Sequence, residues 1–223
     1  MEKGNSTPTV KGNSLMSFAF ISSLVGGLIM IAGNIWAIIR KLYYNGFVNP
    51  DIRSIVAVVF CIFGMICIFN IYKSKKGAYS LVAFSVVNLA LALLEMRDII
   101  DDIYYGLLLR SVPKLLIIIA FVALVVTLLT GFRKNDLTIA KYVSIACVVL
   151  RVYVIFSSLI SLINYYKSSS IIDSSFGFSM SVSPSIILLI IAVGAALFSL
   201  AILLIILSIM KEDDRANSIA ERK

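Results

Sequence analysis

The sequence predicts an all-α fold, a polytopic membrane bundle of six transmembrane helices with both termini in the cytoplasm. Composition gives the first indication. Of the 223 residues, 60% are hydrophobic and 14% are charged, and the mean hydropathy is +1.00. An ordinary soluble domain is about 45–50% apolar and about 25% charged. The other two indications are the lengths of the apolar runs and the distribution of basic residues between them.

Six apolar runs are long enough to cross a bilayer. A hydrocarbon core about 30 Å thick needs roughly 20 apolar residues per helix. The runs cover residues 15–39, 52–72, 78–97, 112–132, 139–164 and 184–210. The connections between the runs are short, so residues 15–210 are predicted to form a single transmembrane domain. Residues 1–14 and 211–223 are predicted to be mobile polar tails.

The basic residues set the predicted orientation. With six spans, the side that holds both tails carries twelve lysines and arginines, and the opposite side carries seven. Cytoplasmic loops carry the excess of positive charge, so both tails are expected in the cytoplasm. No window of five residues holds more than three basic residues, which argues against a nucleic-acid partner. The long, isoleucine-rich runs favour the cell (plasma) membrane.

Prolines and tyrosines agree with this division into spans. Pro50, Pro113 and Pro184 lie at the predicted starts of the second, fourth and sixth spans, where the missing N–H of proline would have no helical partner in any case. Nine of the ten tyrosines fall at predicted span ends, as expected for aromatic belts at the two interfaces. Tyr153 alone lies in the interior of a span.

Small residues line one face of the first span and a shorter face of the last. Such faces let two helix backbones approach closely in lipid. They are predicted to pack inside the bundle, and the alternative is that one of them docks a second protein. The residues are Ala19, Ser23, Gly26, Gly27, Gly33 and Asn34 in the first span, and Ala192 and Ala196 in the last.

Arg151 is the only charged residue between Tyr142 and Ile163. On a helical wheel it shares a small, mildly polar face with Ser144, Cys147, Ser158 and Ser161, so it is predicted to point into the bundle. The rise of about 1.5 Å per residue places it level with Asn88 of the third span. Helical side chains lean toward the helix N-terminus, which makes Ser85 a further candidate partner.

Arg151, Asn88 and Ser85 are therefore the candidate ligand-binding residues. An ionisable residue inside the membrane is a hypothesis of function by default, and a guanidinium suits a carboxylate or a phosphate. The alternative is a structural arginine held by Asn88, backbone carbonyls and water, or one that reaches lipid phosphates. Glu95 is predicted about 26 Å above Ala78 and out of reach of Arg151, so no tight buried ion pair is expected.

Two segments on the side opposite the tails have an additional pattern. The acidic residues Glu95, Asp98 and Asp102 share one helical face, which predicts a short amphipathic helix at the interface; binding of a divalent cation is the alternative. Residues 176–183 alternate apolar and small residues, the period of an extended segment. A hairpin or lid over the bundle is one interpretation, and a loosely ordered loop is the other.

Several chemistries find no support in the sequence. The chain contains no histidine, the commonest general base and a usual zinc ligand. The three cysteines, Cys61, Cys67 and Cys147, lie inside spans without a C-x-x-C spacing and are interpreted as packing residues. No nucleotide-binding, hydrolase or metalloprotease motif is present. We therefore expect no enzyme activity, no cofactor and no metal site.

Two functions remain. The favoured one is a non-catalytic integral membrane protein that acts as a helix-packing accessory or scaffold component, with lipid and another membrane protein or a second copy as partners. The alternative is a protein that binds or transports a small anionic solute near Arg151 and Asn88. A polar cavity at mid-membrane would favour the solute, whereas a filled core would favour the scaffold.

Overall fold

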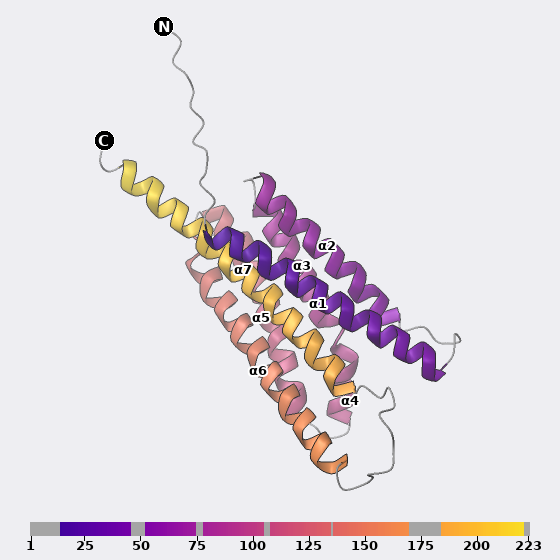
Figure 1. The fold of residues 1–223 in the computed structure, drawn as a ribbon. Helices are drawn as coiled ribbons and strands as arrows, with labels where there is room; N and C mark the ends of the chain where they lie inside the picture. The colour runs from indigo at the N-terminus through magenta and orange to yellow at the C-terminus, as the bar shows by residue number, and fades with distance from the viewer. Residues whose placement is uncertain are drawn as a thin grey trace.

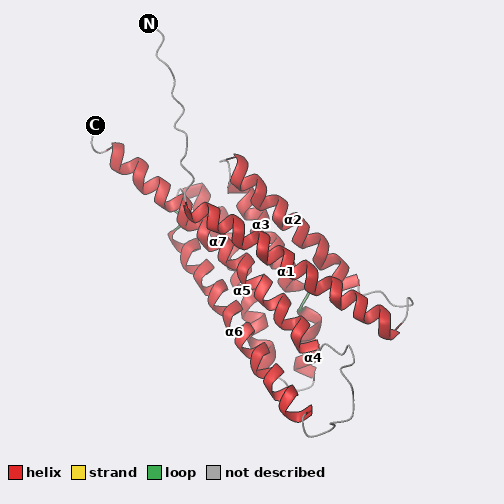
Figure 2. Cartoon of the chain, viewed as in Figure 1, coloured by secondary structure: helices red, strands yellow, loops and turns green. Residues whose placement is uncertain are grey.

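The computed structural model describes residues 14–45, 52–74, 78–104, 108–134, 136–169 and 184–220. The tail at residues 1–13 and the segment 176–183, for which a hairpin was one interpretation, lie outside the described residues. Within them the chain is helical apart from short turns (Figure 2). The predicted all-α membrane bundle is therefore confirmed at the level of helices and their apolar character.

The described residues form seven helices. They are α1 (Ser14–Asn45), α2 (Ile52–Ser74), α3 (Ala78–Leu93), α4 (Met96–Tyr104), α5 (Leu108–Lys134), α6 (Thr138–Ser169) and α7 (Pro184–Ala220). Five of them, α1, α2, α5, α6 and α7, are long and apolar enough to cross a membrane. The helix α3 is apolar but shorter, with 16 residues.

The third predicted span differs most from the structure. It was expected as one helix over residues 78–97, but α3 ends at Leu93 and α4 begins at Met96. The turn is closed by backbone hydrogen bonds from Leu94 to Ala90 and from Glu95 to Ala92, each 3.1 Å long. The break falls where the apolar run meets a segment with charged residues every few positions, which suits an amphipathic helix better than a span.

Other helix boundaries shift by one or a few turns. The helix α5 begins at Leu108, so Pro113 lies within its second turn and not at its start. The helix α7 begins at Pro184 as expected, but it continues to Ala220, past the predicted end of the span at residue 210. Its last ten residues, 211–220, are mostly polar and still helical.

The long helices and α3 form a closed ring. Neighbours around the ring are α1, α2, α3, α5, α6 and α7, and α7 packs back on α1. A further contact between α3 and α7 crosses the middle, and α4 packs on α5. The start of α1 and the end of α7 lie at one end of the bundle, which we call the terminal end; α4 and the start of α7 lie at the far end (Figure 1).

The interior is filled by aliphatic and aromatic side chains. Phe84 of α3 and Phe198 of α7 meet edge to face, with ring centroids 5.1 Å apart, where these two helices cross the centre. The largest apolar side chains that are almost entirely buried are Phe84, Phe121, Phe198, Leu81, Ile99, Ile117, Leu124, Leu128, Ile202, Ile205 and Ile206. All except Ile99 of α4 come from α3, α5 and α7, so these three helices build most of the core.

The tight turn between α5 and α6 is held by backbone contacts at the terminal end. The amide of Asp136 donates to the carbonyl of Gly131 at 3.0 Å, and the amide of Lys141 donates to Leu137 at 2.9 Å. A Cβ on Gly131 would lie 2.7 Å from the carbonyl oxygen of Asp136. Only a glycine fits this approach, which keeps α5 and α6 antiparallel and adjacent.

Candidate functional site

The small-residue face of α1 lies against α7 and α2. A Cβ on Gly26 would be 2.8 Å from the carbonyl oxygen of Gly194, and one on Gly27 would be 2.7 Å from the sulfur of Met65. Buried members of the two small-residue faces are Ala19, Ser23, Gly26, Gly27, Gly33 and Asn34 on α1, and Ala192 on α7; Ala196 is half-buried. The structure thus uses these faces inside the bundle, where close backbone packing brings the first and last helices together.

Arg151 points into the bundle from α6. Its side chain is only 2% exposed, and Cys147 and Ser144, one and two turns earlier on the same face, are also buried. The side chain of Ser161, assigned to this face from the sequence, lies outside the described part of the chain. This face of α6 lies between α5 and α7. Among its described residues, only the arginine is large.

Glu95 is the partner of Arg151. The arginine Nη1 lies 3.1 Å from Oε1 of Glu95, whose side chain is 30% exposed. The expectation that Glu95 lies out of reach of Arg151, so that no tight buried ion pair forms, is therefore wrong. Because α6 begins at Thr138, Arg151 stands thirteen residues, or about 20 Å, above its start. Glu95 stands seventeen residues, or about 25 Å, above the start of α3, a difference that the two long side chains bridge.

The turn after α3 also determines where Glu95 points. Its backbone carbonyl accepts a hydrogen bond of 3.1 Å from the amide of Ile99, which starts the hydrogen-bond pattern of α4. Ile99 is buried against the bundle, with 1% exposure. The carboxylate is thus held at the junction of two helices, with one side toward Arg151 and the other toward the surface.

Phe121 of α5 provides a second contact for the arginine. The guanidinium carbon lies 5.7 Å from the centroid of the Phe121 ring, within the range of a cation–π interaction. Phe121 is entirely buried, so the contact is made away from water, where such interactions are strongest. Arg151 is therefore held by α5 and by the α3–α4 turn together.

One atom of the guanidinium has no partner. Nε of Arg151 is buried and makes no hydrogen bond to any of the residues that the structure describes. A carboxylate can bind an arginine through two parallel hydrogen bonds, whereas Glu95 is placed to use one Nη. The hydrogen-bonding groups of the Arg151 guanidinium are thus only partly satisfied. A water molecule or an oxyanion oxygen could accept a hydrogen bond from Nε.

Asn88 and Ser85 are buried but satisfied within their own helix. Asn88 Nδ2 donates to the carbonyl of Phe84 at 3.0 Å, and Ser85 Oγ donates to the carbonyl of Leu81 at 2.9 Å. Within the described residues neither makes a hydrogen bond to Arg151. Since α3 packs on α2, α5 and α7 while α6 packs on α5 and α7, the structure does not assemble the three candidate residues into one polar site.

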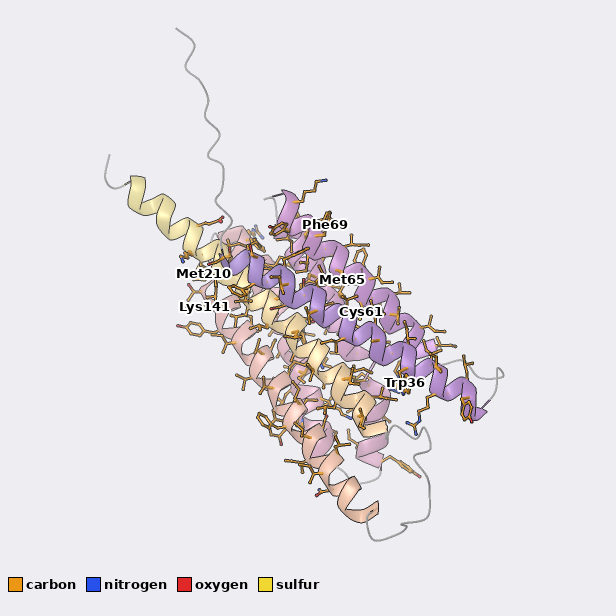
Figure 3. All side chains as sticks on the ribbon, viewed as in Figure 1. Trp36, Cys61, Met65, Phe69, Lys141 and Met210 are labelled. Atoms are coloured by element: carbon orange, nitrogen blue, oxygen red, sulfur yellow. The ribbon has the colours of Figure 1, made fainter. Side chains whose placement is uncertain are left out.

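A shallow apolar groove runs along the surface between α1 and α2. It has a volume of about 290 Å³ and is lined by Phe20, Ser23, Leu24, Ile62, Met65, Ile66 and Phe69. Figure 3 labels Met65 and Phe69 on the α2 side. The only polar side chain there is Ser23, and its hydroxyl donates to the carbonyl of Phe20 at 2.8 Å. The groove suits hydrocarbon and offers no polar recognition.

Metal-binding groups are not gathered in the described part of the chain. Within it, no three His, Cys, Asp or Glu side chains lie close enough to share an ion. The side chains of Asp98 and Asp102 lie outside the described residues, so the acidic cluster with Glu95 is not placed. Cys61, Cys67 and Cys147 are free thiols buried in separate places.

Sequence reasoning found Arg151, rejected Glu95 as its partner and missed Phe121. The signal for Glu95 was present, because an amphipathic segment directly after an apolar run implies a helix break at their junction. No sequence signal distinguishes Phe121 from the other apolar residues of α5. In comparisons with known proteins, no family model, curated protein or solved structure matches this chain.

Proposed function

We propose that this chain is a non-catalytic, multi-pass protein of the plasma membrane that acts as a packing component of a membrane assembly. One observation supports this most: the interior is filled, and the buried polar side chains that the structure describes find partners within the chain, apart from Nε of Arg151. Arg151 is paired with Glu95. The hydroxyl of Ser199 and the amides of Asn34 and Asn88 donate to carbonyls of their own helices.

The proposal includes six crossings with both tails in the cytoplasm. The five long helices account for five of them. The helix α3 spans about 24 Å at 1.5 Å per residue, slightly less than a hydrocarbon core of about 30 Å, and the turn and α4 continue from it at the far end. The larger number of basic residues at the terminal end supports its cytoplasmic location.

Cysteine labelling tests this topology. Lys73 is exposed near the terminal end of α2, and Tyr104 is 84% exposed at the end of α4. A membrane-impermeant maleimide added to intact cells should label Tyr104→Cys and spare Lys73→Cys until the membrane is opened. The three native cysteines are buried, so the unsubstituted chain is the control. Labelling of Lys73→Cys alone in intact cells would show that the orientation is the reverse of the proposed one.

Intact-mass analysis tests the assembly role. The protein would be extracted from its own membrane with the surrounding lipid, and the masses in each particle would be measured. A second protein or a second copy in fixed stoichiometry is the expected result. Particles that hold one chain and lipid only would contradict the proposal.

A second function is favoured by the unpartnered Nε of Arg151. An oxyanion that entered beside the half-exposed Glu95 would give this atom a hydrogen-bond acceptor and would compete with the carboxylate. Phosphate and a short-chain carboxylate would serve as probes in thermal unfolding. If the solute hypothesis holds, one of them raises the melting temperature of the wild type and not that of Arg151→Met. Equal effects on both chains would remove this candidate.

A further inference from the structure

The helix α6 presents an apolar stripe to the outside of the bundle. Its main helix contacts are with α5 and α7, and it forms one edge of the molecule (Figure 1). The α6 stripe consists of Tyr142, Ala146, Val149, Tyr153, Phe156 and Ile160, all exposed. Their separations alternate between four and three residues, the spacing at which one helix packs along another at a small crossing angle.

Tyr153 brings a polar hydroxyl to the middle of this apolar stripe. Its side chain is 53% exposed, and it stands eleven residues from Tyr142 and eleven from Asn164, or about 16 Å from each. That distance is far longer than a tyrosine side chain, so the hydroxyl cannot reach either interface. Among the described residues it has no hydrogen-bond partner. A hydroxyl that is exposed to hydrocarbon without a hydrogen-bond partner is unfavourable.

The exposed stripes of the other long helices lack such a group. Between Phe18 and Ile35 on α1, between Ile55 and Phe69 on α2, and between Val112 and Leu129 on α5, the exposed positions that the structure describes are aliphatic or phenylalanine. These three faces suit lipid as they stand. The α6 stripe is equally apolar over its middle part, except that the hydroxyl of Tyr153 adds a hydrogen-bond donor and acceptor without a partner at mid-depth.

We infer that the α6 stripe is the contact surface for a second copy of this chain. The inference rests on the proposed function and names its surface, because the small-residue faces are occupied inside the bundle. A two-fold axis along the membrane normal places both copies of Tyr153 at the same depth. A hydroxyl both donates and accepts, so each phenol can satisfy the other. Val149 and Phe156, on either side, would close the contact against lipid.

Photo-cross-linking tests the surface in native membranes. A benzoylphenylalanine would replace Tyr153, and Ile119 on α5, which is 62% exposed, would be replaced as the matched control. We expect an adduct of twice the chain mass at position 153 and none at position 119. Adducts to lipid alone, or equal self-adducts at both positions, would overturn the inference. An adduct to a different protein would also overturn it while leaving the assembly role of the proposed function intact.

A second variant tests the hydroxyl itself. Tyr153→Phe keeps the ring and removes only the donor and acceptor. The dimer association constant in liposomes should fall about threefold, the change that corresponds to an average interhelical hydrogen bond of about 0.6 kcal/mol in membranes. Tyr142→Phe is the control, since Tyr142 lies near the end of its span, with Lys141 Nζ 4.9 Å from the centroid of its ring. An unchanged constant for Tyr153→Phe, or an equal fall for both variants, would contradict the role given to Tyr153.

Discussion

Arg151 on α6 and Glu95 after α3 are 3.1 Å apart, although 56 positions separate them in the chain. The pair joins α6, which packs on α5 and α7, to the turn that leads from α3 into α4. It therefore connects the two elements that lie on either side of α5 in the ring. With Phe121 beside the guanidinium, a residue that is costly in a membrane becomes a link between three parts of the bundle.

Gly194 fixes the distance between α1 and α7. A Cβ at this position would lie 2.7 Å from the carbonyl oxygen of Gly26 and would collide with Met30. Gly194→Ala should lower the free energy of unfolding by about 1–3 kcal/mol, because the backbones must separate. Reversible unfolding in mixed micelles measures this.

Gly64→Ala is the matched control for that variant. A Cβ on Gly64 would be 3.1 Å or more from its neighbours, all of which are side-chain atoms of Phe198, Phe84 and Val87. These side chains can shift by a few tenths of an ångström, so the loss should be smaller. A loss as large as that of Gly194→Ala would show that the α1–α7 crossing is not specially tight.

Asp136 makes the start of α6 sensitive to pH. Its Oδ1 accepts a hydrogen bond of 2.9 Å from the amide of Thr138, and mainly this bond holds the pKa of the carboxyl below its ordinary value. A lowered pKa in the folded state means that the stabilisation is present above the ordinary pKa, near 4. It is lost as the pH falls through the lower, folded value.

Hydrogen exchange of the peptide that contains Thr138 measures the hydrogen bond on which this pH sensitivity depends. At neutral pH, Asp136→Ala should speed exchange at the start of α6, and Asp136→Asn should speed it less, since an asparagine oxygen can still accept. The structure would be contradicted if both variants exchanged like the wild type.

Phe121 should stabilise the bundle partly through Arg151. We expect Phe121→Leu to lower the free energy of unfolding more in the wild type than in an Arg151→Met background, by about 0.5–2 kcal/mol, the range of cation–π interactions. Phe84→Leu, at another fully buried phenylalanine, should cost the same in both backgrounds. A coupling near zero for Phe121 would mean that the ring acts only by filling space.

The helices could largely be predicted from the sequence because apolar runs of 20 residues or more have few alternatives to a membrane helix. The inward face of α6 followed from helical periodicity around Arg151. The end of α3 at Leu93 did not, since Glu95 was treated as part of one continuous helix. The pairing of Arg151 failed for the same reason, because a rise along straight helices cannot account for a turn or for side chains that extend toward each other.

The docking role of the small-residue faces is another point that periodicity could not decide. Gly26 on α1 would look the same in sequence whether it met α7 or a second protein. Only the three-dimensional contact with Gly194 shows that this face is occupied within the chain. The exposed position of Tyr153 was likewise visible only in the structure, although the sequence marked it as the one tyrosine inside a predicted span.

The most direct test of whether Arg151 serves the fold is a double-mutant cycle with Glu95, measured as free energies of unfolding. Glu95→Gln should cost about 2–4 kcal/mol because it leaves a buried charge without its partner. Arg151→Met should cost less, since the half-exposed Glu95 can take up water. The double variant should be more stable than Glu95→Gln alone. If Glu95→Gln is neutral and the two effects simply add, the pair does not hold the bundle together, and the central claim is wrong.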